Sequence, residues 1–128
     1  MRYINLLDKT SRVKTSKCFV YNNVIIFAVP RELVGRAIGP NGENAKKIQN
    51  ILGKKVRIIE EPRGIENAEK FVKDIVEPVD FKSLELQGNE FILNAGSQSK
   101  AALIGRNKVR LQELGLILED NFNKTLRI

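Results

Sequence analysis

Residues 37–48 read Ala-Ile-Gly-Pro-Asn-Gly-Glu-Asn-Ala-Lys-Lys-Ile, and they form the most informative pattern in the chain. An apolar pair leads into Gly-x-x-Gly, and apolar residues return at Ala45 and Ile48 after a polar stretch. That spacing is typical of one face of a helix. The two glycines allow backbone conformations and close approaches that a Cβ atom would block. The stretch therefore predicts a helix, a very tight turn and a second helix.

The same frame returns in the second half of the chain. Residues 103–108 read Leu-Ile-Gly-Arg-Asn-Lys, and Leu111 and Leu114 follow them. An ungapped alignment pairs residues 23–53 with 89–119 and gives these identities: Asn23/Asn89, Ile26/Ile92, Ile38/Ile104, Gly39/Gly105, Asn41/Asn107, Ile51/Ile117 and Leu52/Leu118. An internal repeat predicts a structure in which one unit is built twice.

The sequence around each turn predicts the same order of elements. We expect a helix, two strands, two helices joined by the glycine turn, and a last strand, over residues 2–9, 17–21, 24–29, 30–38, 42–52 and 54–59. In the second half the corresponding ranges are 68–76, 81–87, 90–95, 97–104, 108–121 and 124–128. Ile51 is predicted to share the buried face of its helix with Ile48, and Asn67 to cap the helix at 68–76.

The composition argues against catalysis and metal binding. The chain has no histidine, which is the commonest general base and metal ligand, and its one cysteine cannot form an internal disulfide or a thiolate zinc site. Cys18 lies in an apolar strand pattern, so we expect a buried, inert thiol. We predict no enzyme activity, no catalytic residue, no metal and no cofactor.

Other features of the composition bear on where the protein acts. No apolar run approaches the roughly 18 residues of a membrane span, and the N-terminus lacks the apolar core of a signal peptide. We therefore expect a cytoplasmic protein with no membrane partner, and a monomer. Hydrophobic residues make up 42% of the chain, which is enough for packed cores and too many for disorder.

The net charge of +7 is unevenly distributed. Residues 1–64 carry 13 Lys and Arg against 5 Asp and Glu, whereas residues 65–128 carry 9 against 10. All of the net positive charge therefore lies in the first half. A basic surface of this kind favours polyanionic partners, although ordinary solvation of the surface explains charge alone equally simply.

These residues carry a resemblance to a known family. Ile38-Gly39-x-x-Gly42 between two helices, with flanking strands, resembles the K-homology (KH) motif. The helix and strand before the core resemble the type II arrangement of that fold. Two such units in tandem, with residues 38–44 and 52–56 in the first and 104–111 in the second, are similar to the archaeal NusA-like transcription factors.

The resemblance implies an α+β fold of two tandem type II KH domains, each a three-stranded sheet with helices packed on one face. We place the first unit at residues 1–62 and the second, with a degenerate glycine loop, at 63–128. Units of about 60 residues are small for independent stability, so we expect them to pack into one rigid body. Lys108 stands where the second glycine is expected; either it replaces that glycine or the loop is shortened, and the repeat frame favours replacement.

The resemblance also implies single-stranded RNA as the partner, because a KH loop clamps about four nucleotides of backbone. A role in transcription elongation or termination with RNA polymerase or its elongation complex follows from the NusA likeness. The predicted RNA-binding residues are Arg36, Ile38, Gly39, Pro40, Asn41, Gly42, Asn44, Lys46, Lys47, Gly105, Arg106, Asn107, Lys108 and Arg110.

Other interpretations of the same residues stay open. Each glycine turn could be only a tight helix connection, and each lysine or arginine beside it could be only a solvated charge. The second unit could be kept for packing alone. In function, the alternatives are a ribosome-associated or ribosome-assembly KH protein, and a protein-interaction adaptor built on KH scaffolds.

Overall fold

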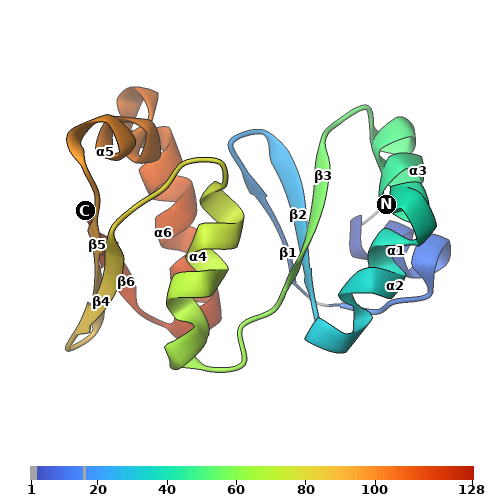
Figure 1. Cartoon of the computed structure of the whole chain (residues 1–128), viewed down its shortest axis with the longest axis horizontal. Coiled ribbons are helices and arrows are strands. Elements are labelled where there is room, and N and C mark those ends of the chain that lie inside the picture. The colour runs from blue at the N-terminus through green and yellow to red at the C-terminus, as the bar shows by residue number, and fades with distance from the viewer. Residues whose placement is uncertain (1–2, 16) are drawn as a thin grey trace. The chain divides into compact units, whose positions relative to one another are not determined.

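The computed structural model describes residues 3–15 and 17–128, and the chain divides into two compact units between Glu61 and Pro62. The first unit follows the predicted order of elements (Figure 1). Its elements are α1 (Tyr3–Ser11), β1 (Lys17–Tyr21), β2 (Val24–Val29), the short 3₁₀ helix η1 (Arg31–Leu33), α2 (Val34–Ile38), the 3₁₀ turn η2 (Pro40–Gly42), α3 (Glu43–Leu52) and β3 (Val56–Glu60).

The second unit repeats this order. Its elements are η3 (Ile65–Asn67), α4 (Ala68–Val76), β4 (Ser83–Gln87), β5 (Glu90–Asn94), α5 (Ser97–Ile104), η4 (Arg106–Lys108), α6 (Val109–Phe122) and β6 (Thr125–Arg127). The last helix is longer than its counterpart, with 14 residues in α6 against 10 in α3. The repeat read from the sequence is therefore a repeat of structure.

Both sheets have the same topology. In the first, β1 pairs antiparallel with β2, and β2 pairs parallel with β3, from Ile25 opposite Val56 to Val29 opposite Glu60. In the second, β4 pairs antiparallel with β5, and β5 pairs parallel with β6. A parallel pair needs a long crossover, which the two helices and the glycine turn supply in each unit. The predicted fold class, an α+β chain with two three-stranded sheets, is confirmed.

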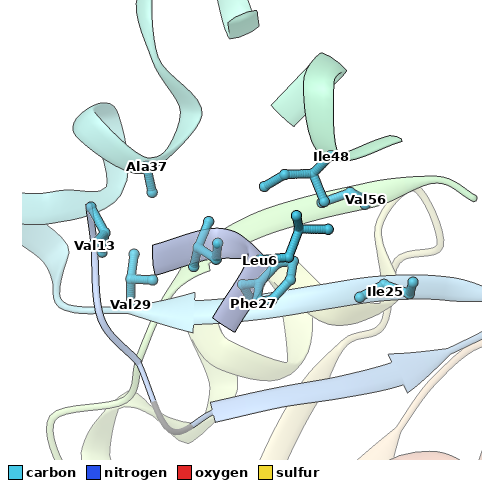
Figure 2. Packing of buried hydrophobic residues seen from close by; sticks show 9 residues of the cluster. Leu6, Val13, Ile25, Phe27, Val29, Ala37, Ile48 and Val56 are labelled. Atoms are coloured by element: carbon cyan, nitrogen blue, oxygen red, sulfur yellow. The ribbon is translucent and has the colours of Figure 1, made fainter. Parts of the chain in front are cut away.

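The core of the first unit lies between one face of its sheet and its three helices (Figure 2). Leu6 and Leu7 of α1 meet Ile25, Phe27 and Val29, which alternate along β2 and so point to the same face. The helices on either side of the glycine turn and the last strand complete the cluster with Ala37, Ile48 and Val56. The core therefore holds both helices of the turn against the sheet.

Three aromatic rings mark the core of the second unit. The ring of Phe122, at the end of α6, lies edge-on to Phe71 of α4 at 6.0 Å and to Phe91 of β5 at 5.6 Å between centroids. Phe81 is also buried, under the ammonium group of Lys73. Phe81 and Phe122 therefore serve packing in the second unit.

Two local expectations are wrong. Ile51 is 64% exposed and lies off the buried face of α3, whereas its counterpart Ile117 is 4% exposed. Asn67 stands at the N-terminus of α4, but its side chain makes no cap; its Oδ1 instead accepts a hydrogen bond from the backbone N–H of Arg63 at 3.1 Å. That bond orders the residues between the last strand of one unit and the first helix of the next.

Across residues 3–15 and 17–128, none of the helices combines the length and the apolar character needed to span a bilayer.

Ile48 and Ile51 lie on the same helix and form a matched pair of test sites. Ile48 is fully buried, so Ile48→Ala leaves a cavity and should lower the free energy of unfolding by about 2–5 kcal/mol. Ile51→Ala should change it by less than about 0.5 kcal/mol, because that side chain is mostly in water. Urea denaturation measures both, and equal losses would contradict the burial described above.

Candidate nucleic-acid interface

The first glycine turn has an unusual backbone. Gly39 (φ 82°, ψ 168°) lies in a region that only glycine readily occupies, and Asn41 (55°, 26°) and Gly42 (71°, 20°) are both left-handed. The amide of Gly39 closes the last turn of α2 on the carbonyl of Gly35, and the amide of Gly42 bonds the carbonyl of Gly39 at 3.1 Å. Helix α3 then begins at once, so its N-terminus lies at the turn.

The second turn repeats this backbone almost angle for angle. Gly105 has φ 72° and ψ 175°, Asn107 has 56° and 26°, and Lys108 has 62° and 21°. The amide of Lys108 bonds the carbonyl of Gly105 at 3.2 Å, as Gly42 does in the first turn. Lys108 therefore replaces the expected glycine without shortening the loop, as the repeat frame predicted. A left-handed lysine costs about 1–2 kcal/mol relative to glycine.

A side chain bridges the two helices across each turn. The Nδ2 atom of Asn44 donates to the carbonyl oxygen of Arg36 at 3.1 Å, and the Nη1 atom of Arg110 donates to that of Ala102 at the same distance. Donors and acceptors stand at equivalent positions of the repeat. In each helix, the carbonyl one residue before this acceptor accepts the last hydrogen bond made within the helix. The carbonyls of Arg36 and Ala102 therefore need a donor from outside the helix. We call this pair of contacts the interlock.

The interlock explains why the two glycine positions differ. A Cβ atom on Gly39 would come within 2.9 Å of the Asn44 side chain, and one on Gly105 within 2.9 Å of the Arg110 side chain. A Cβ atom on Gly42 would meet nothing within 4 Å. The first glycine is therefore required by the fold, whereas the second position accepts a side chain that tolerates a left-handed backbone, as Lys108 does.

The cations near the two turns are placed differently. In the first unit the turn itself has no charged residue, and Pro40 lacks a backbone N–H. Exposed cations lie on the neighbouring helices at Arg36, Lys46 and Lys47, and Lys47 lies 3.8 Å from the carboxylate of Glu43. In the second unit Arg106 and Lys108 are both exposed within the turn.

The structure gathers most of the predicted site residues at the two turns. Ile38 and Gly39 lead into the first turn half-buried, and Asn41 is exposed at its tip, as Asn107 is in the second. Lys46 and Lys47 lie on the exposed side of α3. Asn44 and Arg110 are half-buried in the interlock. The sequence has a hydrogen-bond donor at this position in both repeats, but asparagine and arginine are different residue types, so the shared role is not evident from the sequence.

Other chemistry has little support among the described residues. They contain no cluster of three or more potential metal ligands, and burial raises the pKa of the Cys18 thiol to about 11, so the thiol is protonated at neutral pH. The lack of enzyme activity stays a prediction.

Comparison with known families places the first turn in a recognised domain. Residues 24–73 match the model of the KH domain. The match begins at β2 and contains α2, the first glycine turn, α3 and β3. The second unit has the same strand topology and the same turn geometry.

Two curated relatives extend the likeness beyond one domain. The chain is 28% identical over 92 residues to the probable transcription termination protein NusA of Methanococcus vannielii, covering 70% of this chain and 51% of the relative. It is 34% identical over 76 residues to the protein of the same name from Methanocaldococcus jannaschii, covering 59% of this chain and 40% of the relative. The aligned part thus spans about half the length of these relatives or less.

A solved structure matches nearly the whole chain. The crystal structure of APE1850 aligns with a TM-score of 0.66 and 26% sequence identity, covering 98% of this chain and 96% of the other. The KH match thus covers most of the first unit, and the second unit repeats the strand topology and the turn geometry of the first. Together with the KH match, the two curated relatives make the chain similar to NusA-like KH proteins.

The difference between the two glycine positions is testable by substitution in the first turn. Gly39→Ala should lower the free energy of unfolding by about 3 kcal/mol or more, because it combines a glycine-only backbone with contact against Asn44. Gly42→Ala should cost about 1–2 kcal/mol, the left-handed penalty alone. Chemical denaturation of both variants checks this order, and a Gly42→Ala loss as large as that of Gly39→Ala would contradict it.

Proposed function

We propose that this chain binds single-stranded RNA through its two glycine turns and acts in transcription elongation or termination with RNA polymerase. The observation that carries the proposal is the repetition of one turn geometry in a KH fold. Each turn brings the backbone to the N-terminus of a following helix, where N–H groups and the positive end of the helix dipole favour a phosphate.

The chemistry of the chain favours RNA in single-stranded form. Aromatic residues make up only 6% of the chain, and Phe71, Phe91 and Phe122 are committed to packing, so base stacking on aromatic rings is a minor device. Aliphatic contacts and hydrogen bonds to base edges have to serve instead. Those edges are accessible in single-stranded RNA and hidden in a duplex.

The proposed interface consists of the two turns and the cations that flank them. Its members are Arg36, Ile38, Gly39, Pro40, Asn41, Gly42, Lys46, Lys47, Gly105, Arg106, Asn107 and Lys108. The first turn contributes a backbone of fixed shape with no charge of its own, and the second contributes the same shape with two exposed cations. RNA affinity should therefore fall as salt concentration rises.

Substitution of Gly42 tests the binding site directly. Gly42→Asp places a carboxylate where a phosphate is expected. A Cβ atom has room at this position and Asp is one of the residues that tolerate a left-handed backbone, so the fold should survive. Affinity for a single-stranded RNA oligomer should fall at least tenfold, which is about 1.4 kcal/mol. Fluorescence anisotropy measures the affinity, and circular dichroism checks the fold.

The matched control is Gly42→Asn, which has nearly the same size and backbone strain but no charge. It should bind RNA much more tightly than Gly42→Asp. Wild-type affinity in the Gly42→Asp variant would remove the first turn from the RNA site, and a flat salt response would remove phosphate contact altogether.

The role in transcription rests on the names of the two curated relatives, each a probable transcription termination protein. Affinity purification of the tagged protein from its native cells, after nuclease treatment, should enrich RNA polymerase subunits over ribosomal proteins. Enrichment of ribosomal proteins instead would favour the ribosome-associated alternative. Partners of neither kind, together with no RNA binding by the purified protein, would favour the adaptor.

A further inference from the structure

We propose that Arg110 is a positioning residue, which holds the second glycine turn in its RNA-binding shape, and that it does not contact phosphate itself. Asn44 has the same task in the first turn. The proposal rests on the proposed function, because only RNA binding by the turn makes its shape functionally important. It separates Arg110 from the other two cations of the segment, which the sequence alone groups with it.

The surroundings of Arg110 differ from those of its neighbours. Arg106 and Lys108 are exposed, whereas Arg110 is half-buried. Its Cγ atom lies 2.9 Å from the place where a Cβ atom on Gly105 would stand, and its Nη1 atom donates to the carbonyl of Ala102. The side chain thus lies across the glycine, between α5 and α6.

The first unit shows that this task needs no charge. Asn44 occupies the equivalent position, lies over Gly39 in the same way and donates to the equivalent carbonyl with a neutral amide. The first and second glycine turns have nearly the same backbone angles. Because asparagine and arginine both make this contact, it depends on a hydrogen-bond donor of the right reach and not on a charge.

Two favourable interactions hold the Arg110 side chain against the end of α5. The carbonyl of Ala102 follows the last hydrogen bond of α5, so it needs a donor from outside its helix. A cation at the C-terminal end of a helix also interacts favourably with the helix dipole. Swinging the guanidinium out to a phosphate would give up both interactions and remove the group that spans the turn.

The test uses three variants and the salt dependence of RNA binding. With a single-stranded oligouridine as the probe, Arg110→Ala should weaken binding about tenfold and leave the slope of log affinity against log salt unchanged. Arg110→Asn, which copies the first unit, should restore binding to within about threefold of the wild type. Arg106→Ala is the contrast: it removes an exposed cation, and its slope should become shallower by about 0.7, the value for one phosphate on a single strand.

Two results would overturn the proposal. The first is an Arg110→Asn variant as weak as Arg110→Ala, with a slope as shallow as that of Arg106→Ala, which would make Arg110 a phosphate ligand. The second is an Arg110→Ala variant that binds as tightly as the wild type, which would leave Arg110 without a part in binding.

A measurement without RNA separates this proposal from the proposed function. The amide of Gly105 bonds the carbonyl of Ala101 at the end of α5, and the amide of Lys108 bonds the carbonyl of Gly105 within the turn. Their hydrogen exchange therefore reports the integrity of the turn and of its junction with α5. Exchange should accelerate in Arg110→Ala and return to the wild-type rate in Arg110→Asn, while thermal unfolding confirms that both variants are folded. Unchanged exchange in Arg110→Ala would refute the positioning role even if RNA binds, and a wild-type protein that binds no RNA would refute only the function.

Discussion

The two hydrogen bonds of the interlock are the contacts on which the rest of the candidate site depends. Each joins the start of one helix to the open carbonyl at the end of the helix before it, across a glycine that has no room for a side chain. With both ends held, the intervening residues have little choice of backbone. The hydrogen bond between the side-chain donor and the carbonyl, together with the glycine that makes room for it, thus fixes where the N-terminus of the second helix is exposed to solvent.

This arrangement frees the remaining positions of the turn to vary. Between the glycine and the first residue of the following helix, the first unit has proline, asparagine and glycine, and the second has arginine, asparagine and lysine. The backbone angles hardly change. Asparagine is the one shared residue, and it is the residue other than glycine that best tolerates a left-handed conformation. The repeat therefore keeps its shape while charge at the turn is present in one copy and absent from the other.

Much of this was readable from the sequence, and the failures have definite causes. The element order followed from hydrophobic periodicity, turn residues and the repeat, because those signals are local. The burial of Ile51 is predicted wrongly because helical spacing indicates which side of a helix a residue lies on. It does not indicate whether a neighbouring element extends far enough to cover that residue. The interlock could not be predicted, because the carbonyls that Asn44 and Arg110 bond lie eight residues away along the chain. How the two units pack together stays a prediction.

The proposed function requires that both turns, despite their different side chains, contact RNA. An NMR titration of the isotope-labelled chain with a single-stranded RNA oligomer tests it most directly. Changes in amide chemical shift should concentrate at residues 39, 41 and 42 and at residues 105–108. Shifts confined to one turn would reduce the site to a single unit, and shifts in the strands β4, β5 and β6 with both turns unmoved would place RNA elsewhere.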